Sequence, residues 1–220
     1  MKTSSSDPII TNLTISIEVI SQPAIFIEDF FSWYHYPDAM HYLHRLFKLL
    51  FQKAKKKKLH NTASNLVFYY ENLVKLLEIS WVICHQDNDQ KGANLYFDLE
   101  GQQPLMAVSM YVEQRHADRA FDFFPRDLSE EELLRPYDVF PKMFKHYSLS
   151  KWKEQLNNLL HHAIDRFQGD ISTDEFNLFW TPRLLGKMIS ACHLIYVREL
   201  CTPVALQKGK DEEQQADQYS

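Results

Sequence analysis

Apolar residues recur every three to four positions along much of the chain, which predicts a mainly helical protein. The clearest stretch ends near His85, and its apolar residues mark one face of a long helix. The residues of this face are Leu66, Tyr69, Tyr70, Leu73, Leu77 and Trp81. Further helices are predicted over residues 24–34, from Pro37 onward and over residues 151–167.

The segment 188–200 is apolar almost all round, which is typical of a helix at the centre of a bundle. We therefore expect a bundle of four to six helices. Ser129, with Glu132 three residues later, forms a capping box and predicts a helix start. Ser150 is expected to cap the helix that follows it. Pro182 is expected to bend the last helix, because proline removes a backbone donor.

A small β element is expected beside the helices. Apolar and polar residues alternate between residues 11 and 20, with Leu13, Ile15, Ile17 and Val19 as the apolar set. This period of two predicts a half-buried strand. A second alternating run and a turn predict a short strand or hairpin near residues 94–112.

The length of 220 residues fits one large domain. We expect a flexible leader over residues 1–10 and a single globular domain over residues 11–207. The irregular section 94–147 is either part of this domain or a separate subdomain or insertion. Residues 208–220 are charged and rich in Gln, so they are expected to form a disordered tail.

Composition excludes several functional classes. The chain has five Gly, and no two lie close together, so neither a dinucleotide fingerprint nor a P-loop can be built. A net charge of -5 does not supply the basic surface of a general nucleic-acid binder. Three irregularly spaced Cys predict free thiols in a reducing compartment, and we expect a cytoplasmic protein. No uninterrupted apolar run reaches the roughly 18 residues of a membrane span, so no membrane association is expected.

One group of candidate metal ligands falls on the predicted helices. A di-metal carboxylate bundle takes Glu and His ligands from several facing helices. The residues that could fill this role are His41, His44, Glu71, Glu78 and His162. They predict, as an alternative function, a helical-bundle enzyme that uses a divalent metal. Their spacing fits the template only loosely, so we expect no cofactor.

A lysine cluster supports a second alternative, a nucleic-acid-associated protein. Its residues are Lys53, Lys55, Lys56, Lys57 and Lys58, of which the last four are the candidate phosphate contacts. Lysines at a helix end also complement the helix dipole, which is the simpler interpretation.

Aromatic residues make up 14% of the chain and are concentrated in one segment. Its rings belong to Phe30, Phe31, Trp33, Tyr34 and Tyr36. These rings are too many for one face of one short helix, and aromatic residues are enriched at the centres of interfaces. The alternative is that they fill a large core. We therefore expect a non-enzymatic interaction or regulatory protein that binds a protein partner, or a second copy, through an aromatic groove.

Overall fold

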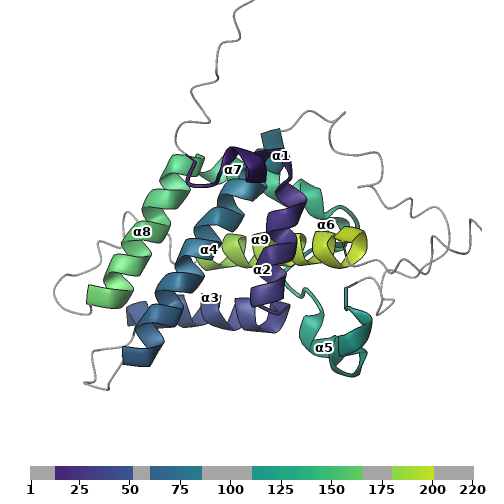
Figure 1. The fold of residues 1–220 in the computed structure, drawn as a ribbon, viewed down its shortest axis with the longest axis horizontal. Coiled ribbons are helices and arrows are strands. Elements are labelled where there is room, and N and C mark those ends of the chain that lie inside the picture. Colours follow the sequence, from purple (N-terminus) through teal and green to yellow (C-terminus); the bar gives the residue numbers. More distant parts are fainter. Residues whose placement is uncertain (1–12, 52–59, 86–110, 166–179, 201–220) are drawn as a thin grey trace, which may run out of the picture.

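The computed structural model describes residues 13–51, 60–85, 111–165 and 180–200, and most of them are helical (Figure 1). The N-terminal elements are α1 (Ile17–Ser21), α2 (Pro23–Trp33), α3 (Tyr36–Phe51) and α4 (His60–His85). The middle elements are η3 (Gln114–Arg119), α5 (Ala120–Phe123), α6 (Glu130–Leu134), η4 (Pro136–Asp138) and α7 (Val139–His146). The C-terminal elements are α8 (Leu149–Asp165), α9 (Trp180–Ile195) and η5 (Tyr196–Leu200), which is a turn of π-helix. The predicted helical class is confirmed for the described residues.

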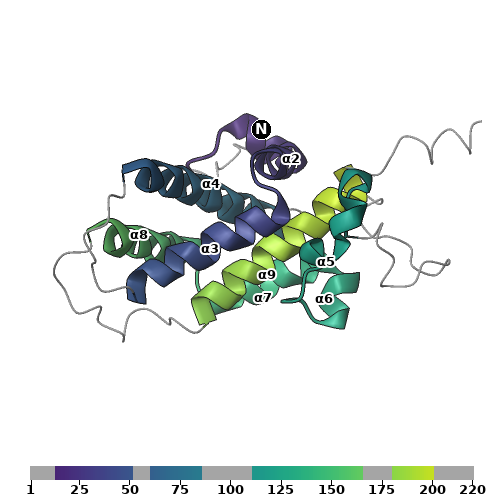
Figure 2. The ribbon, with the colours of Figure 1, turned by 90° about the horizontal axis from the view of Figure 1, so that it is seen from below.

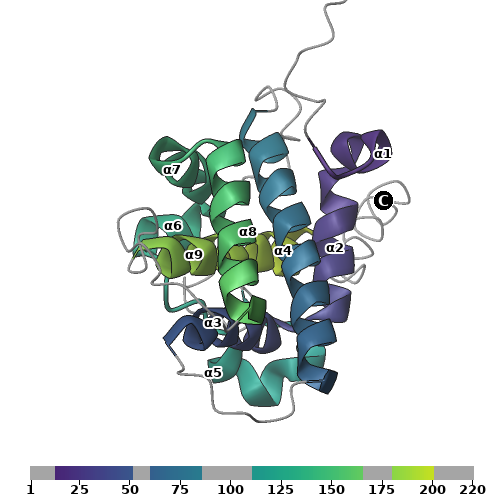
Figure 3. The same cartoon turned by 90° about the vertical axis from the view of Figure 1, so that its left-hand side faces the viewer.

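The long helices form two layers that cross. In one layer α2, α4 and α8 lie side by side (Figure 3). In the other, α3 and α9 run along each other beneath them (Figure 2). Between the layers lies one apolar core, to which α7 adds Val139, Phe140 and Met143. Helix α9 is buried along most of its length, which confirms its predicted central position.

Local sequence explains where the helices begin. The capping box is confirmed, because the Ser129 hydroxyl accepts from the Glu132 N–H while the Glu132 carboxylate accepts from the Ser129 N–H. The cap expected at Ser150 is wrong by two residues: α8 begins at Leu149, and the Ser148 hydroxyl accepts from the Lys151 N–H at 3.3 Å. Pro182 is the third described residue of α9, and the residues before Trp180, which a bend at this proline would involve, lie outside the described residues.

The predicted N-terminal strand is wrong. Residues 17–21 form α1, and the Ser16 hydroxyl caps this helix by accepting from the Val19 N–H at 3.4 Å. The preceding backbone is held by Glu78 of α4, whose carboxylate accepts from the Thr14 N–H at 2.8 Å. In the described residues no strand is present for this segment to pair with, so the local cap prevails over the alternating pattern.

The other β prediction and the predicted ends of the domain fall mostly outside the described residues. Residues 94–110 are among these, and Tyr111 and Val112, which are described, form a turn and a bend. The leader 1–10 and the tail 208–220 also lie outside the described residues. Within the described part of the chain, no helix is long and apolar enough to cross a bilayer.

Candidate partner-binding surface

Helix α2 has an inner and an outer face at helical spacing. The inner face carries the buried residues Ile27, Phe30 and Phe31, which join the core. The outer face is exposed and follows the spacing i, i+3, i+4, i+7, i+8. Its residues are Ile25, Glu28, Asp29, Ser32 and Trp33.

The most exposed tryptophan of the described residues lies on this outer face. The Trp33 side chain is 70% exposed, although its indole ring has a neighbour on the next helix. The Trp33 and Phe68 ring centroids are 5.8 Å apart in an edge-to-face arrangement. Phe68 belongs to α4 and is itself 45% exposed. This Trp33–Phe68 pair therefore joins the outer faces of two helices that pack together (Figure 3).

The charges around this pair are mostly negative. Glu28, Asp29 and Glu71 are exposed, and no described cation forms an ion pair with any of them. Helix α2 has no Lys, Arg or His in its sequence. We call the surface formed by Ile25, Glu28, Asp29, Trp33, Phe68 and Glu71 the α2–α4 face.

Four of the five rings of the predicted aromatic groove lie in the core. Phe30, Phe31, Tyr34 and Tyr36 are buried. Phe31 stacks on Tyr196 of η5 at 5.3 Å, and Tyr36 stacks on His193 of α9 at 4.5 Å. Phe30 and Phe31 fill the core because α2 packs against α4 and η5, whereas Tyr36, the first residue of α3, is buried because α3 packs along α9. Whether Trp33 binds a partner stays a prediction.

The candidate metal ligands do not converge among the described residues. His41, His44 and Glu71 are exposed on α3 and α4. The Glu78 side chain is 0% exposed and forms an ion pair with Lys153 of α8 at 2.5 Å. In the part of the chain that is described, no group of three or more His, Cys, Asp or Glu is arranged to hold a metal ion. The side chain of His162 and the candidate lysines Lys55–Lys58 lie outside the described residues.

Two buried groups on α9 carry chemistry that the sequence patterns did not reveal as a site. The His193 Nε2 atom donates to the Tyr111 carbonyl at 2.9 Å, and burial lowers the pKa of His193 to about 3. Burial also raises the pKa of the Cys192 thiol to about 12. Both side chains are therefore uncharged at neutral pH.

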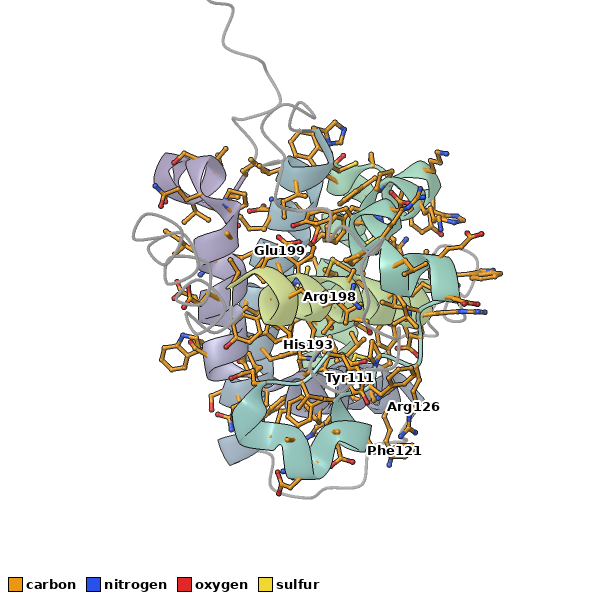
Figure 4. The ribbon with its side chains drawn as sticks, turned by 90° about the vertical axis from the view of Figure 1, so that its right-hand side faces the viewer. Tyr111, Phe121, Arg126, His193, Arg198 and Glu199 are labelled. Carbon is orange, nitrogen blue, oxygen red and sulfur yellow. The ribbon has the colours of Figure 1, made fainter. Side chains whose placement is uncertain are left out.

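The η5 turn, directly after α9, holds a third unusual group. The Tyr137 hydroxyl donates to Glu199 Oε2 at 2.7 Å, and burial raises the pKa of Glu199 to about 7. The neighbouring Arg198 donates to the Leu133 carbonyl at 2.6 Å. Figure 4 shows Glu199, Arg198 and His193 in succession on one side of the molecule. A sequence pattern could not reveal this site, because Tyr137 and Leu133 are more than 60 residues away.

No family model, no curated protein and no solved structure matches the chain. Function is therefore inferred from the surface and the buried groups themselves.

Proposed function

We propose that this protein is a non-enzymatic interaction protein that docks a protein partner on the α2–α4 face. The observation that carries this proposal is the 70% exposure of Trp33 beside a second exposed ring. Tryptophan is enriched among the residues that dominate binding energy, because it buries a large apolar area in a rigid ring. A partner that covers Trp33 and Phe68 removes this area from water.

The state of the buried reactive groups supports a non-enzymatic role. Cys192 and His193 are the kinds of side chain that nucleophilic catalysis uses. Burial raises the pKa of Cys192 to about 12 and lowers the pKa of His193 to about 3, so they do not form a thiolate–imidazolium pair at neutral pH. A cytoplasmic setting is supported by the buried Cys192, which is a free thiol, as a reducing compartment maintains it.

The test compares partner capture by the full-length protein and by two tryptophan variants. Trp33→Ala is expected to lose the captured partner, and Trp180→Ala is expected to keep it. Trp180 is the matched control because it is an exposed tryptophan, 46% accessible, on α9 rather than on α2. Circular dichroism of each variant checks that the helices are intact. Equal capture by wild type and Trp33→Ala would overturn the proposal.

A further inference from the structure

The α2–α4 face alternates apolar and acidic groups along α2. Ile25 is followed one turn later by Glu28 and Asp29, and one further turn leads to Trp33. At a rise of about 1.5 Å per residue, the two apolar ends are about 12 Å apart. A complementary surface thus needs two apolar contacts separated by about two helical turns.

Helix α4, which packs beside α2, also carries an exposed apolar residue followed by an exposed acidic residue. Phe68 meets Trp33 at the end of α2, whereas Glu78, further along α4, binds Thr14, which precedes α1. The two helices therefore run in opposite directions. Glu71 lies one turn beyond Phe68, at the level of the acidic residues of α2.

Three exposed carboxylates thus lie between apolar ends, and the nearest cation on this part of α4 is the half-buried Lys75. No described cation forms an ion pair with Glu28, Asp29 or Glu71. An acidic partner would meet like charges here, whereas a basic one gains complementary potential. The charge pattern therefore favours a positively charged partner.

We propose that the α2–α4 face receives a basic amphipathic helix from a partner protein. This inference rests on the proposed docking function and names the partner's chemical class. The partner presents apolar side chains at positions i and i+7 or i+8, which cover Ile25 and the Trp33–Phe68 pair. Lys or Arg at i+3 or i+4 face Glu28, Asp29 and Glu71. Side chains one turn apart on such a helix share a face and can contact the α2–α4 face together.

The probes are three fluorescein-labelled synthetic peptides of about 18 residues, a length that permits a helix of several turns. All three carry the same leucines at i and i+7. The positions that face the carboxylates hold Lys in the first peptide, Gln in the second and Glu in the third. Anisotropy with the full-length protein gives each dissociation constant. The Lys peptide is expected to bind at least about tenfold more tightly than the Glu peptide. This preference is expected to shrink as salt rises, because exposed charges are screened.

Variants of the protein locate the binding. Trp33→Ala is expected to weaken the Lys peptide by about tenfold or more. Trp180→Ala, the matched control, is expected to leave it within about twofold. A Glu28→Gln, Asp29→Gln double variant, which keeps Glu71, is expected to reduce the preference for Lys over Gln while leaving the Gln peptide bound. Together with the weaker binding of the Lys peptide to Trp33→Ala, which keeps the net charge of -5, this result assigns the preference to the α2–α4 face.

The other outcomes separate the two proposals. If the Gln or Glu peptide binds more tightly and still needs Trp33, the basic class is overturned and the docking surface stands. Lys-peptide binding that ignores Trp33→Ala reflects bulk charge and overturns the assignment to this face. Self-association that Trp33→Ala abolishes in the ultracentrifuge makes the occupant a second copy. If no peptide binds, the basic helix is overturned, and the capture experiment above still decides the docking surface.

Discussion

The α6 junction holds the buried carboxylate of Glu132 and the η5 turn holds the half-buried carboxylate of Glu199, and the two carboxylates have different partners. Glu132 accepts from the Ser129 N–H at 3.0 Å and forms ion pairs with Lys187 at 2.5 Å and Lys142 at 3.2 Å. Glu199 accepts from the uncharged hydroxyl of Tyr137. Arg198 is next to Glu199 in the chain, yet its Nη1 atom donates to a backbone carbonyl.

The difference shows that burial alone does not decide the charge of a carboxylate. Burial raises the pKa of both groups, but at Glu132 the hydrogen bonds from Lys187, Ser129 and Lys142 outweigh it and lower the pKa to about 2. At Glu199 burial remains the larger effect, and the pKa rises to about 7. Glu132 is therefore a permanent anion that fastens α6 to α9, whereas Glu199 changes charge near neutral pH.

The largest expected effect comes from removing the anion at the α6 junction. Glu132→Gln keeps the shape of the side chain but leaves Lys187, which is 17% exposed, without its counter-charge. Breaking such a buried pair is expected to lower the free energy of unfolding at pH 7 by about 2–4 kcal/mol. Urea unfolding followed by circular dichroism measures the loss.

The matched control is Glu154→Gln, because the Lys151–Glu154 pair is exposed on both sides, at 40% and 53%. Its loss is expected to cost less than about 0.5 kcal/mol. The lowered pKa of Glu132 also predicts a fall in the free energy of unfolding at acidic pH, which we call the acid limb. The contribution of Glu132 is complete above the ordinary pKa of 4.5 and is lost as pH falls toward 2. An acid limb of equal size in wild type and Glu132→Gln would contradict the assignment.

The second expected effect has the opposite pH dependence. The raised pKa of Glu199 means that its contribution to stability is fully present below 4.5 and is lost as pH rises through about 7. Glu199→Gln is uncharged at every pH and can still accept from Tyr137. At pH 8 this variant is expected to be more stable than wild type by about 1–3 kcal/mol, a range that allows for partial solvent access.

Urea midpoints measured from pH 4.5 to pH 8 test this expectation. The wild type is expected to lose stability across this range, and Glu199→Gln is expected to show a flatter profile. Glu154→Gln again serves as the control and is expected to follow the wild type. A Glu199→Gln protein that is less stable than wild type at pH 8 would show that the ionised carboxylate is a net stabiliser.

These two sites also mark how far the sequence could predict the structure. The capping box of Ser129 and Glu132 was predictable because both residues lie in one turn. Lys187 was not, because its contact with Glu132 joins residues 55 positions apart, which only the packing of α6 on α9 brings together. The Glu199 site depends on a π-turn and on Tyr137, which is 62 positions away.

The distinction between contacts within one turn and contacts between distant parts of the chain also explains the predictions that were wrong. The alternation of residues 11–20 indicated a strand, but a strand needs a partner, and the segment instead meets the Glu78 carboxylate. The density of rings near residue 33 was visible in the sequence, but the ring that faces outward is set by how α2 rests on its neighbours. Helical periodicity predicted the long helices, whereas the site residues depend on contacts between elements.

The smallest expected effect isolates the hydroxyl that distinguishes the η5 turn. Tyr137→Phe keeps the aromatic contact with Phe140 but removes the donor to Glu199 Oε2. That hydrogen bond lowers the pKa of Glu199, so its loss is expected to raise the pKa above 7, by about half a unit to one unit. The accompanying loss of stability is expected to be about 1 kcal/mol, because one neutral hydrogen bond contributes about that much. Titration of the Glu199 carboxyl carbon by NMR measures the shift.

An unchanged pKa would mean that Tyr137 donates equally well to the protonated form. In that case the hydrogen bonds that Glu132 accepts from Lys187, Ser129 and Lys142 would separate the two carboxylates, and the Tyr137 hydroxyl would have no part in the comparison.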